Sequence, residues 1–179
     1  MNIYLTGYRG TGKSTVAALV AGQLGWAWLD TDELVEGEAG MSIAEIFSSQ
    51  GEAGFREREY QVLCQCARLD AHVVALGGGA VIPEANRELL RRGGPMVWLT
   101  ATPGTILERL EEDPATASRR PPLVAGGGRE EVERLLSERS PVYQDCADLV
   151  VPTDQKTPQQ VAGEIVAWFG SQAHGGDRR

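Results

Sequence analysis

The sequence predicts a three-layer α/β/α fold built around a five-stranded parallel sheet. Short apolar runs alternate with longer segments in which apolar residues recur every three or four positions. The runs are almost continuously apolar, which is typical of strands covered by helices on both faces. Glycines and carboxylates follow the first three runs, at the sheet edge where parallel α/β folds bind their ligands.

Each expected strand ends at a turn-forming or polar residue. The five runs are residues 2–6, 26–29, 73–76, 96–99 and 148–151. Between them the apolar spacing predicts helices at 12–24, in two or three pieces from about 31 to 69 with breaks near Gly40 and Gly51, and at 83–92, 103–112, 130–139 and 158–169. The order of elements is therefore that of an α/β fold with crossover helices.

The length of 179 residues predicts a single domain, which we expect to span residues 1–170. A chain of this size buries enough surface to fold without disulfides or a structural metal. Residues 112–128 lack periodicity and are rich in proline, glycine and alanine, so we expect a mobile loop or lid there. Residues 171–179 are expected to form a flexible tail.

The net charge of −8 argues against nucleic-acid binding, because a phosphate backbone requires a basic surface. No apolar run reaches the ~20 residues that span a bilayer, and no leader-like segment precedes the first strand. The three cysteines have no disulfide or zinc spacing, which is typical of thiols in a reducing compartment. We therefore expect a monomer in the cytoplasm that binds neither nucleic acid nor membrane.

Residues 7–14 match the phosphate-binding pattern G-x-x-x-x-G-K-[ST], between an expected strand and an expected helix. Backbone N–H groups of such a loop, and the N-terminus of the helix, bind phosphate oxygens. A merely flexible glycine-rich turn is the alternative interpretation. In the phosphate-binding interpretation, Lys13 contacts the β- and γ-phosphates of ATP and the Ser14 hydroxyl is a Mg²⁺ ligand. The predicted nucleotide-binding residues are Gly10, Thr11, Gly12, Lys13, Ser14 and Thr15.

Two carboxylates, Asp30 and Asp32, lie one residue apart at the end of the second expected strand. A nucleotide-bound Mg²⁺ needs only one or two carboxylates in addition to water. Asp30 is the candidate for this role, and Asp32 would then accept a hydrogen bond, or the proton, from the acceptor hydroxyl. Capping of the following helix by Asp30, with Glu33 three residues on, is the competing interpretation.

Six motifs together resemble those of the shikimate kinases, along nearly the whole chain. They are residues 7–15, residues 29–32, Phe55 and Arg56 with Glu59, the three glycines 77–79, Arg120 with Pro121, and Arg139 with Tyr143. The resemblance implies a P-loop domain of the nucleoside-monophosphate-kinase type. It implies a substrate-binding region at about 31–62 and a lid at about 112–128.

The activity implied by this resemblance is the ATP-dependent phosphorylation of shikimate at its 3-hydroxyl, giving shikimate 3-phosphate and ADP, in aromatic amino acid biosynthesis. Mg²⁺ is the implied cofactor. The residues implied to surround shikimate are Asp32, Arg56, Gly78, Gly79 and Arg139. Guanidinium groups suit the carboxylate of such an acceptor, and glycines allow close approach of the backbone.

Each of these assignments has a competing interpretation. Arg56 lies among Glu52, Glu57 and Glu59, so it could belong to an ordinary charged helix face, or be oriented by Glu59. Arg139 follows Glu138 and could form a surface ion pair. The glycines could simply end a strand.

The resemblance also implies a lid arginine and a base pocket. Arg120, directly before Pro121, matches the lid arginine that would neutralise charge on the transferred phosphoryl group, and makes a third catalytic candidate beside Lys13 and Asp32. Arg119 is an alternative, because Pro122 departs from the usual family pattern. Arg109 and Pro158 are expected to hold adenine, with Thr153 and Asp154 in the same turn.

Two other functions remain open from the sequence. A kinase for gluconate or for a nucleotide shares the P-loop fold. A nucleotide-sensing protein that retains the loop without turnover is the alternative outside enzymes. The set of Asp32, Arg56 and Arg139 argues against a nucleotide acceptor, which would need sites for a base and a phosphate, and against a protein without turnover. An assay of ADP release with each acceptor would decide between shikimate and gluconate.

Overall fold

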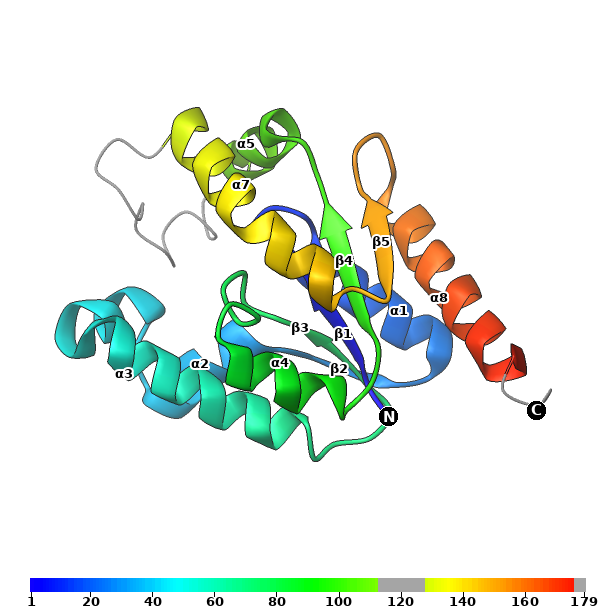
Figure 1. The fold of residues 1–179 in the computed structure, drawn as a ribbon, viewed down its shortest axis with the longest axis horizontal. Coiled ribbons are helices and arrows are strands. Elements are labelled where there is room, and N and C mark those ends of the chain that lie inside the picture. The colour runs from blue at the N-terminus through cyan, green and yellow to red at the C-terminus, as the bar shows by residue number, and fades with distance from the viewer. Residues whose placement is uncertain (113–127, 176–179) are drawn as a thin grey trace.

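Five parallel strands form one sheet in the order β2-β3-β1-β4-β5 (Figure 1). The computed structural model describes residues 1–112 and 128–175. The strands are β1 Ile3–Thr6, β2 Ala27–Asp30, β3 His72–Ala75, β4 Met96–Thr100 and β5 Leu149–Pro152. The five-stranded parallel sheet is thus confirmed, with each boundary within one residue of its expected place. Because β1 is central, the loop after it lies in the middle of the ligand-binding edge.

Helices cover both faces of this sheet, as the three-layer prediction requires (Figure 1). One face carries α1 and α8, and the other carries α3, α4 and the second half of α7. The helices are α1 Lys13–Leu24, α2 Thr31–Ala39, α3 Ile43–Cys66, α4 Glu84–Arg91, α5 Pro103–Glu112, α7 Arg129–Cys146 and α8 Pro158–Gly175.

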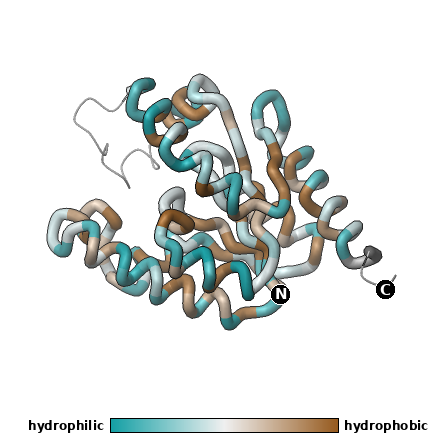
Figure 2. The backbone as a smooth tube through the Cα atoms, viewed as in Figure 1, coloured by the Kyte–Doolittle hydropathy of each residue, from teal (hydrophilic) through white to brown (hydrophobic). Residues whose placement is uncertain are grey.

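The two hydrophobic cores follow from the alternation of side chains along the strands. Ile3 and Leu5 of β1 point towards α1 and α8, whereas Tyr4 points towards the opposite layer. Hydrophobic residues follow one another along the strands, whereas along the helices they alternate with hydrophilic ones (Figure 2). A small third cluster joins α5 to α7, with Tyr8, Ile106, Val132 and Leu135 at its centre.

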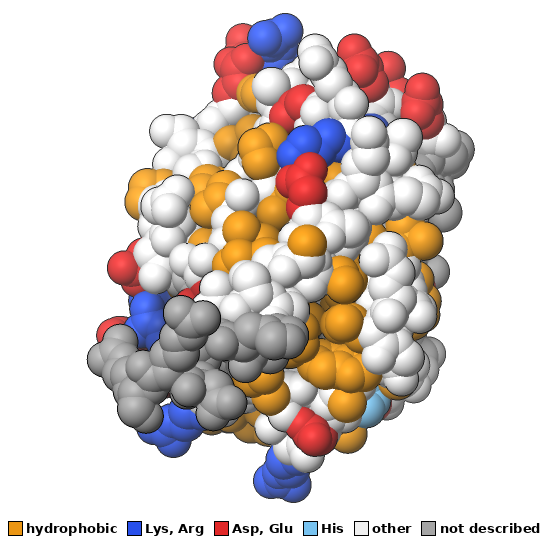
Figure 3. Space-filling model, turned by 90° about the vertical axis from the view of Figure 1, so that its right-hand side faces the viewer, with side chains coloured by type: hydrophobic (Ala, Val, Ile, Leu, Met, Phe, Trp, Pro, Cys, Tyr) orange, Lys and Arg blue, Asp and Glu red, His pale blue; other side chains and the backbone are white. Residues whose placement is uncertain are grey.

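The two edge strands are less well covered than the central ones. Trp28 of β2 is 40% exposed and Val150 of β5 is 37% exposed. On the face that bears α8, hydrophobic side chains lie across the middle and charged side chains mostly around the rim (Figure 3). The expectation that helices cover every strand on both faces therefore holds for β1, β3 and β4 only.

The breaks expected between residues 31 and 69 occur at the two predicted glycines. Gly40 ends α2 in a left-handed conformation, and Ser42 with Glu45 forms a capping box at the start of α3. Gly51 has φ 69° and ψ −175° and kinks α3 without ending it. Left-handed φ at these positions favours glycine.

Two helix ends were predicted wrongly. The helix expected at 130–139 continues through Pro141 to Cys146. An internal proline removes one backbone hydrogen bond and clashes with the carbonyl four residues earlier, but the buried Val132, Leu135, Tyr143 and Cys146 stabilise the helix on both sides of it. The last helix extends to Gly175, so residues 171–175 are helical and not part of a frayed tail.

Within the described residues, no helix is both long and apolar enough to cross a membrane. All three cysteines are free thiols; Cys66 and Cys146 are buried and Cys64 is partly exposed. Burial raises the pKa of the Cys66 thiol to about 11, so this group is a neutral thiol and not a reactive thiolate. The predicted lid at 112–128 lies almost entirely outside the described residues.

Candidate active site

The phosphate loop between β1 and α1 has the conformation that its glycines allow. Gly10 and Gly12 have φ of 79° and 88°, in the left-handed region that other residues rarely adopt. The Thr11 hydroxyl donates a hydrogen bond of 2.8 Å to the Tyr8 carbonyl, which closes the loop on itself. Gly12 then caps α1, so the positive N-terminal end of this helix faces the concave side of the loop.

Lys13 is folded back over the loop and does not extend into solvent. Its Nζ donates to the carbonyl oxygens of Gly7 at 2.8 Å and Tyr8 at 2.9 Å. The ammonium group therefore lies on the concave side of the loop, beside the backbone that would surround a phosphate. This placement suits the predicted role of Lys13 towards the β- and γ-phosphates.

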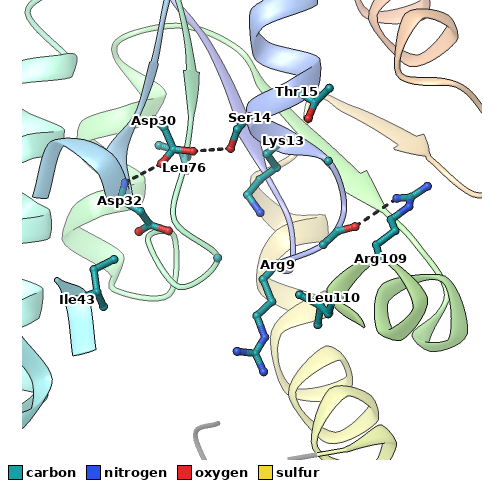
Figure 4. Close-up of a pocket in the computed structure, with 13 residues that line it drawn as sticks. Arg9, Lys13, Ser14, Thr15, Asp30, Asp32, Ile43, Leu76, Arg109 and Leu110 are labelled. Atoms are coloured by element: carbon teal, nitrogen blue, oxygen red, sulfur yellow. Dashed lines mark hydrogen bonds between the residues drawn. The ribbon is translucent and has the colours of Figure 1, made fainter. Parts of the chain in front are cut away.

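Ser14 and Asp30 lie together, as their joint assignment to a metal requires. The Ser14 hydroxyl donates to Asp30 Oδ2 at 2.5 Å (Figure 4). Asp30 Oδ1 also accepts from the backbone N–H of Asp32 at 2.9 Å and of Glu33 at 3.4 Å, so this residue is the N-cap of α2 as well. The capping interpretation of Asp30 is thus confirmed. The predicted metal role is compatible with it, since different carboxylate oxygens contact the helix N-terminus and Ser14.

The hydroxyl and carboxylate oxygens at this point fit Mg²⁺ by their chemistry. Mg²⁺ prefers oxygen ligands and keeps several waters when it binds a nucleotide, so a site with few protein ligands suits it. Among the described residues, no group of three or more histidine, cysteine or carboxylate side chains converges. A metal that depends on phosphate oxygens and water for most of its shell matches this arrangement better than a caged structural ion.

A cavity of about 330 Å³ opens between the phosphate loop and the start of α2. Asp32 and Lys13 face each other across it (Figure 4). The predicted residues that line it are Gly10, Gly12, Lys13, Ser14, Thr15, Asp30, Asp32, Gly78 and Arg109. Four further lining residues were not predicted: Arg9, Ile43, Leu76 and Leu110.

Of these four, only Arg9 had a signal in the sequence, as a cation inside the phosphate motif. Its guanidinium carbon lies 5.8 Å from the centre of the Tyr8 ring, and its Nε is buried. The apolar Ile43, Leu76 and Leu110 come from three distant elements. Only the fold brings them to one cavity.

Arg56 is held at the side of this site by ion pairs. Its guanidinium contacts Glu59 at 2.7 Å and Glu52 at 3.3 Å, and lies 5.4 Å from the centre of the Phe55 ring. Burial lowers the pKa of Arg56, but the charges of Glu59 and Glu52 outweigh this effect and raise the pKa above its ordinary value. Glu59 is buried, and the predicted contact between Glu59 and Arg56 is present.

The turn formed by the three glycines 77–79, which we call the glycine turn, joins the other candidates. A Cβ atom on Gly79 would lie 2.9 Å from a guanidinium nitrogen of Arg56. Arg139 of α7 donates to the Gly78 carbonyl at 3.4 Å. The glycine turn thus lies between Arg56 and Arg139, the two arginines that were predicted to hold the acceptor.

Arg109 connects the phosphate loop to the turn after β5. It donates to Thr153 Oγ1 and to the Thr153 carbonyl, both at 2.9 Å, and to the Gly10 carbonyl at 3.3 Å. Pro158 is exposed at the first position of α8, a position that proline favours, and does not line the cavity. Arg119 and Arg120 lie outside the described residues.

The sheet order and the site together define a class of protein. The phosphate loop follows the central strand of a parallel sheet of order 2-3-1-4-5, and a carboxylate faces its lysine across a cavity. This arrangement is that of a P-loop kinase with the nucleoside-monophosphate-kinase fold.

Comparisons with known proteins identify the family within this class. The family model described as shikimate kinase matches residues 9–169. The shikimate kinase of Rhodopirellula baltica is 43% identical over 165 residues, which cover 92% of this chain and 88% of that protein. That of Symbiobacterium thermophilum is 42% identical over 169 residues, covering 93% and 94%. The chain belongs to the shikimate kinase family.

Solved structures agree with this assignment. The shikimate kinase from Acinetobacter baumannii, in complex with shikimate, aligns with a TM-score of 0.89 at 36% identity and covers 96% of this chain and 93% of that one. The enzyme from Aquifex aeolicus aligns with a TM-score of 0.77 at 32% identity, covering 98% and 99%. The predicted fold class and family are therefore confirmed.

Proposed function

We propose that this protein transfers the γ-phosphoryl group of ATP to the 3-hydroxyl of shikimate, giving shikimate 3-phosphate and ADP in aromatic amino acid biosynthesis. The position of Asp32 carries this proposal. Asp32 faces Lys13 across a single cavity. A carboxylate opposite a phosphate-binding lysine suits an acceptor hydroxyl placed between them.

The roles of the acceptor-side residues follow from their chemistry. Arg56 and Arg139 would bind the shikimate carboxylate by charge-assisted hydrogen bonds. Asp32 would accept a hydrogen bond from the 3-hydroxyl and so direct its oxygen at the γ-phosphorus. The new oxygen–phosphorus bond forms as the bond from the γ-phosphorus to the bridging oxygen of ADP breaks, and the hydroxyl proton passes to Asp32 or to solvent. The protein contributes mainly position and charge.

The nucleotide-side residues are proposed to act together on the triphosphate. The loop N–H groups and Lys13 would hold the phosphates, and Arg109 would contact adenine beside the turn after β5. Mg²⁺ would be held by Ser14 directly and by Asp30 through water, and would neutralise charge on the β- and γ-phosphates. Support for the metal comes from the two oxygens that meet at 2.5 Å.

The organisation of the chain is part of the same proposal. We propose one catalytic domain with a substrate-binding region at 31–62 and a lid at about 112–128 that carries Arg120. We expect it to act as a monomer in the cytoplasm. The three free cysteines support the proposed location, because thiols persist in a reducing compartment. Size-exclusion chromatography with light scattering would measure its oligomeric state.

Steady-state ADP release, measured with shikimate, gluconate and AMP as separate acceptors, tests the activity. We expect shikimate alone to raise ADP production well above the rate without acceptor. Stimulation by only gluconate or AMP would identify a different P-loop kinase. No stimulation by any of the three, with ATP still bound, would indicate a nucleotide-sensing protein.

A further inference from the structure

The backbone of the glycine turn is hydrogen-bonded from two sides, although none of its residues has a side chain. The N–H of Gly77 donates to the Thr31 hydroxyl at 2.8 Å, and Thr31 is 1% exposed. The carbonyl of Gly78 accepts from the Tyr143 hydroxyl at 2.5 Å. Thr31 lies between Asp30 and Asp32, whereas Tyr143 comes from α7, 65 residues further along the chain from Gly78.

Tyr143 shares its acceptor with Arg139. The two residues are one helical turn apart on α7, so they lie on the same face and reach the same carbonyl. The Tyr143 contact is short at 2.5 Å, whereas the Arg139 contact is 3.4 Å, beyond the usual range for N–H···O bonds. The carbonyl therefore holds the phenol tightly and the guanidinium weakly.

The position of Tyr143 is itself well defined. Its side chain is fully buried, and its ring lies 5.7 Å from that of Trp98 on β4. Tyr143 also belongs to the hydrophobic core that covers this side of the sheet. The hydroxyl is thus carried by a ring that the core fixes, independently of any ligand.

We propose that Tyr143 is a positioning residue for the acceptor site. Its hydroxyl makes the short hydrogen bond to the Gly78 carbonyl and leaves Arg139 only a long one, which keeps the Arg139 guanidinium available to an anionic group beside the glycine turn. Without the hydroxyl, Arg139 shortens its existing contact with the carbonyl and is held there. The inference rests on the proposed function in one respect, namely that Arg139 binds the shikimate carboxylate.

The variant Tyr143→Phe removes the hydroxyl and keeps the ring that packs on Trp98. We expect the KM for shikimate to rise roughly 3- to 10-fold, the effect of one lost hydrogen bond. The KM for ATP should change less than about 2-fold, because the phosphate loop makes none of these contacts. An equal rise in both KM values, or no rise for shikimate, would overturn the proposal.

A double-mutant cycle separates positioning of Arg139 from general support of the turn. In an Arg139→Ala background, Tyr143→Phe should have almost no further effect on the KM for shikimate, because the residue through which it acts is gone. Thr31→Val is the matched control: it removes the hydroxyl that accepts from the Gly77 N–H, and its effect should persist in that background. The same fold-change for Tyr143→Phe in both backgrounds would contradict the proposal.

A crystal structure of Tyr143→Phe gives a readout that does not depend on activity. The distance from the Arg139 guanidinium to the Gly78 carbonyl should contract to about 2.9 Å, an ordinary hydrogen-bond length. An unchanged distance would overturn the proposal even if shikimate is the substrate. If this distance contracts in Tyr143→Phe but the native protein does not phosphorylate shikimate, the effect of Tyr143 on Arg139 is retained and the proposed function is rejected.

Discussion

The nucleotide side and the acceptor side of the cavity are built in different ways. The phosphate loop takes its conformation from hydrogen bonds within a few residues, from Thr11 to Tyr8 and from Lys13 to Gly7, and Arg109 adds one contact to Gly10 from a distant helix. The acceptor side is assembled from α3, the glycine turn and α7, with contacts that span up to 65 residues of sequence. The first is a local structure, and the second exists only in the folded protein.

This difference predicts which kinetic constant a substitution on each side of the cavity will change. A change in the phosphate loop should act on phosphoryl transfer or on ATP, because its contacts do not extend to the acceptor arginines. A change on α3 or α7 should act on shikimate alone. Each prediction below tests this division, beginning with the largest expected effect.

Lys13→Met should lower kcat roughly 100- to 1,000-fold, because it removes the cation that would stabilise charge on the transferred group. The KM for shikimate should change little, since the Lys13 ammonium lies over the carbonyls of the phosphate loop, on the nucleotide side of the cavity. Steady-state ADP release at saturating ATP measures both constants. Circular dichroism would show whether the variant keeps the native helix content, and a kcat within tenfold of the native value would remove Lys13 from catalysis.

Asp32→Asn should lower kcat about 100-fold, because an amide keeps the size of the side chain but loses the charge that attracts the acceptor hydroxyl. Asp32 lies at the boundary of the two sides, so the KM values should change less than kcat. The matched control is Asp30→Asn, which we expect to raise the Mg²⁺ concentration needed for half-maximal velocity. The two assignments would be reversed if Asp32→Asn changed only the Mg²⁺ requirement.

Arg139→Ala should raise the KM for shikimate about 10- to 100-fold and leave the KM for ATP unchanged, because it removes one charge-assisted contact. Initial rates at varied shikimate and saturating ATP measure the effect. Arg134→Ala is the control from the same helix: Arg134 is half exposed and pairs at 2.7 Å with Glu138. Such a surface pair contributes little, and equal effects of the two substitutions would place Arg139 outside the site.

The same contrast explains how much the sequence could predict. The phosphate loop was predicted residue by residue, since its function needs one contiguous motif and only glycine readily adopts the left-handed conformation that the loop requires. The acceptor residues were proposed only through a family resemblance. Their contacts with Glu59, with the Gly78 carbonyl and with Gly79 depend on which helix faces of α3 and α7 meet the turn. No local sequence pattern predicts which helix faces pack against the glycine turn.

The fold was predicted better than the helix ends. Strand boundaries follow short apolar runs that end at turn-forming or polar residues, so they were accurate to one residue. The helix was expected to end at Arg139, but burial of Tyr143 and Cys146 carries α7 across Pro141. Tertiary packing outweighs the unfavourable local propensity of proline here, and it is this extension that brings Tyr143 to the glycine turn.

Asp154 provides the smallest predicted effect and tests the nucleotide side away from the loop. Its Oδ1 accepts from the N–H of Thr102 at 3.0 Å, the Thr102 hydroxyl at 3.0 Å and the Thr105 hydroxyl at 2.8 Å. Burial alone raises the pKa of Asp154, but these hydrogen bonds outweigh it and hold the pKa below its ordinary value. The charge also lies at the N-terminus of α5, where it is favourable.

Asp154→Asn keeps the accepting oxygen and removes the charge, so it should lower the melting temperature by about 1–3 °C at neutral pH. Because the folded pKa is depressed, the stabilisation is fully present above the unfolded pKa of about 3.9 and is lost as the pH falls through the folded value. The difference between variant and native melting temperatures should therefore persist at pH 6 and shrink below about pH 4. Differential scanning calorimetry across this range measures it.

The kinetic consequence should fall on ATP alone. Asp154 joins the start of α5 to the turn that contains Thr153, and Arg109 of the same helix donates to Thr153. Loosening that connection should raise the KM for ATP a few-fold, about the effect of one weakened hydrogen bond, while the KM for shikimate stays constant. A rise in the KM for shikimate instead would show that the two sides of the cavity are mechanically coupled. The expectation that substitutions on each side affect only one substrate would then be wrong.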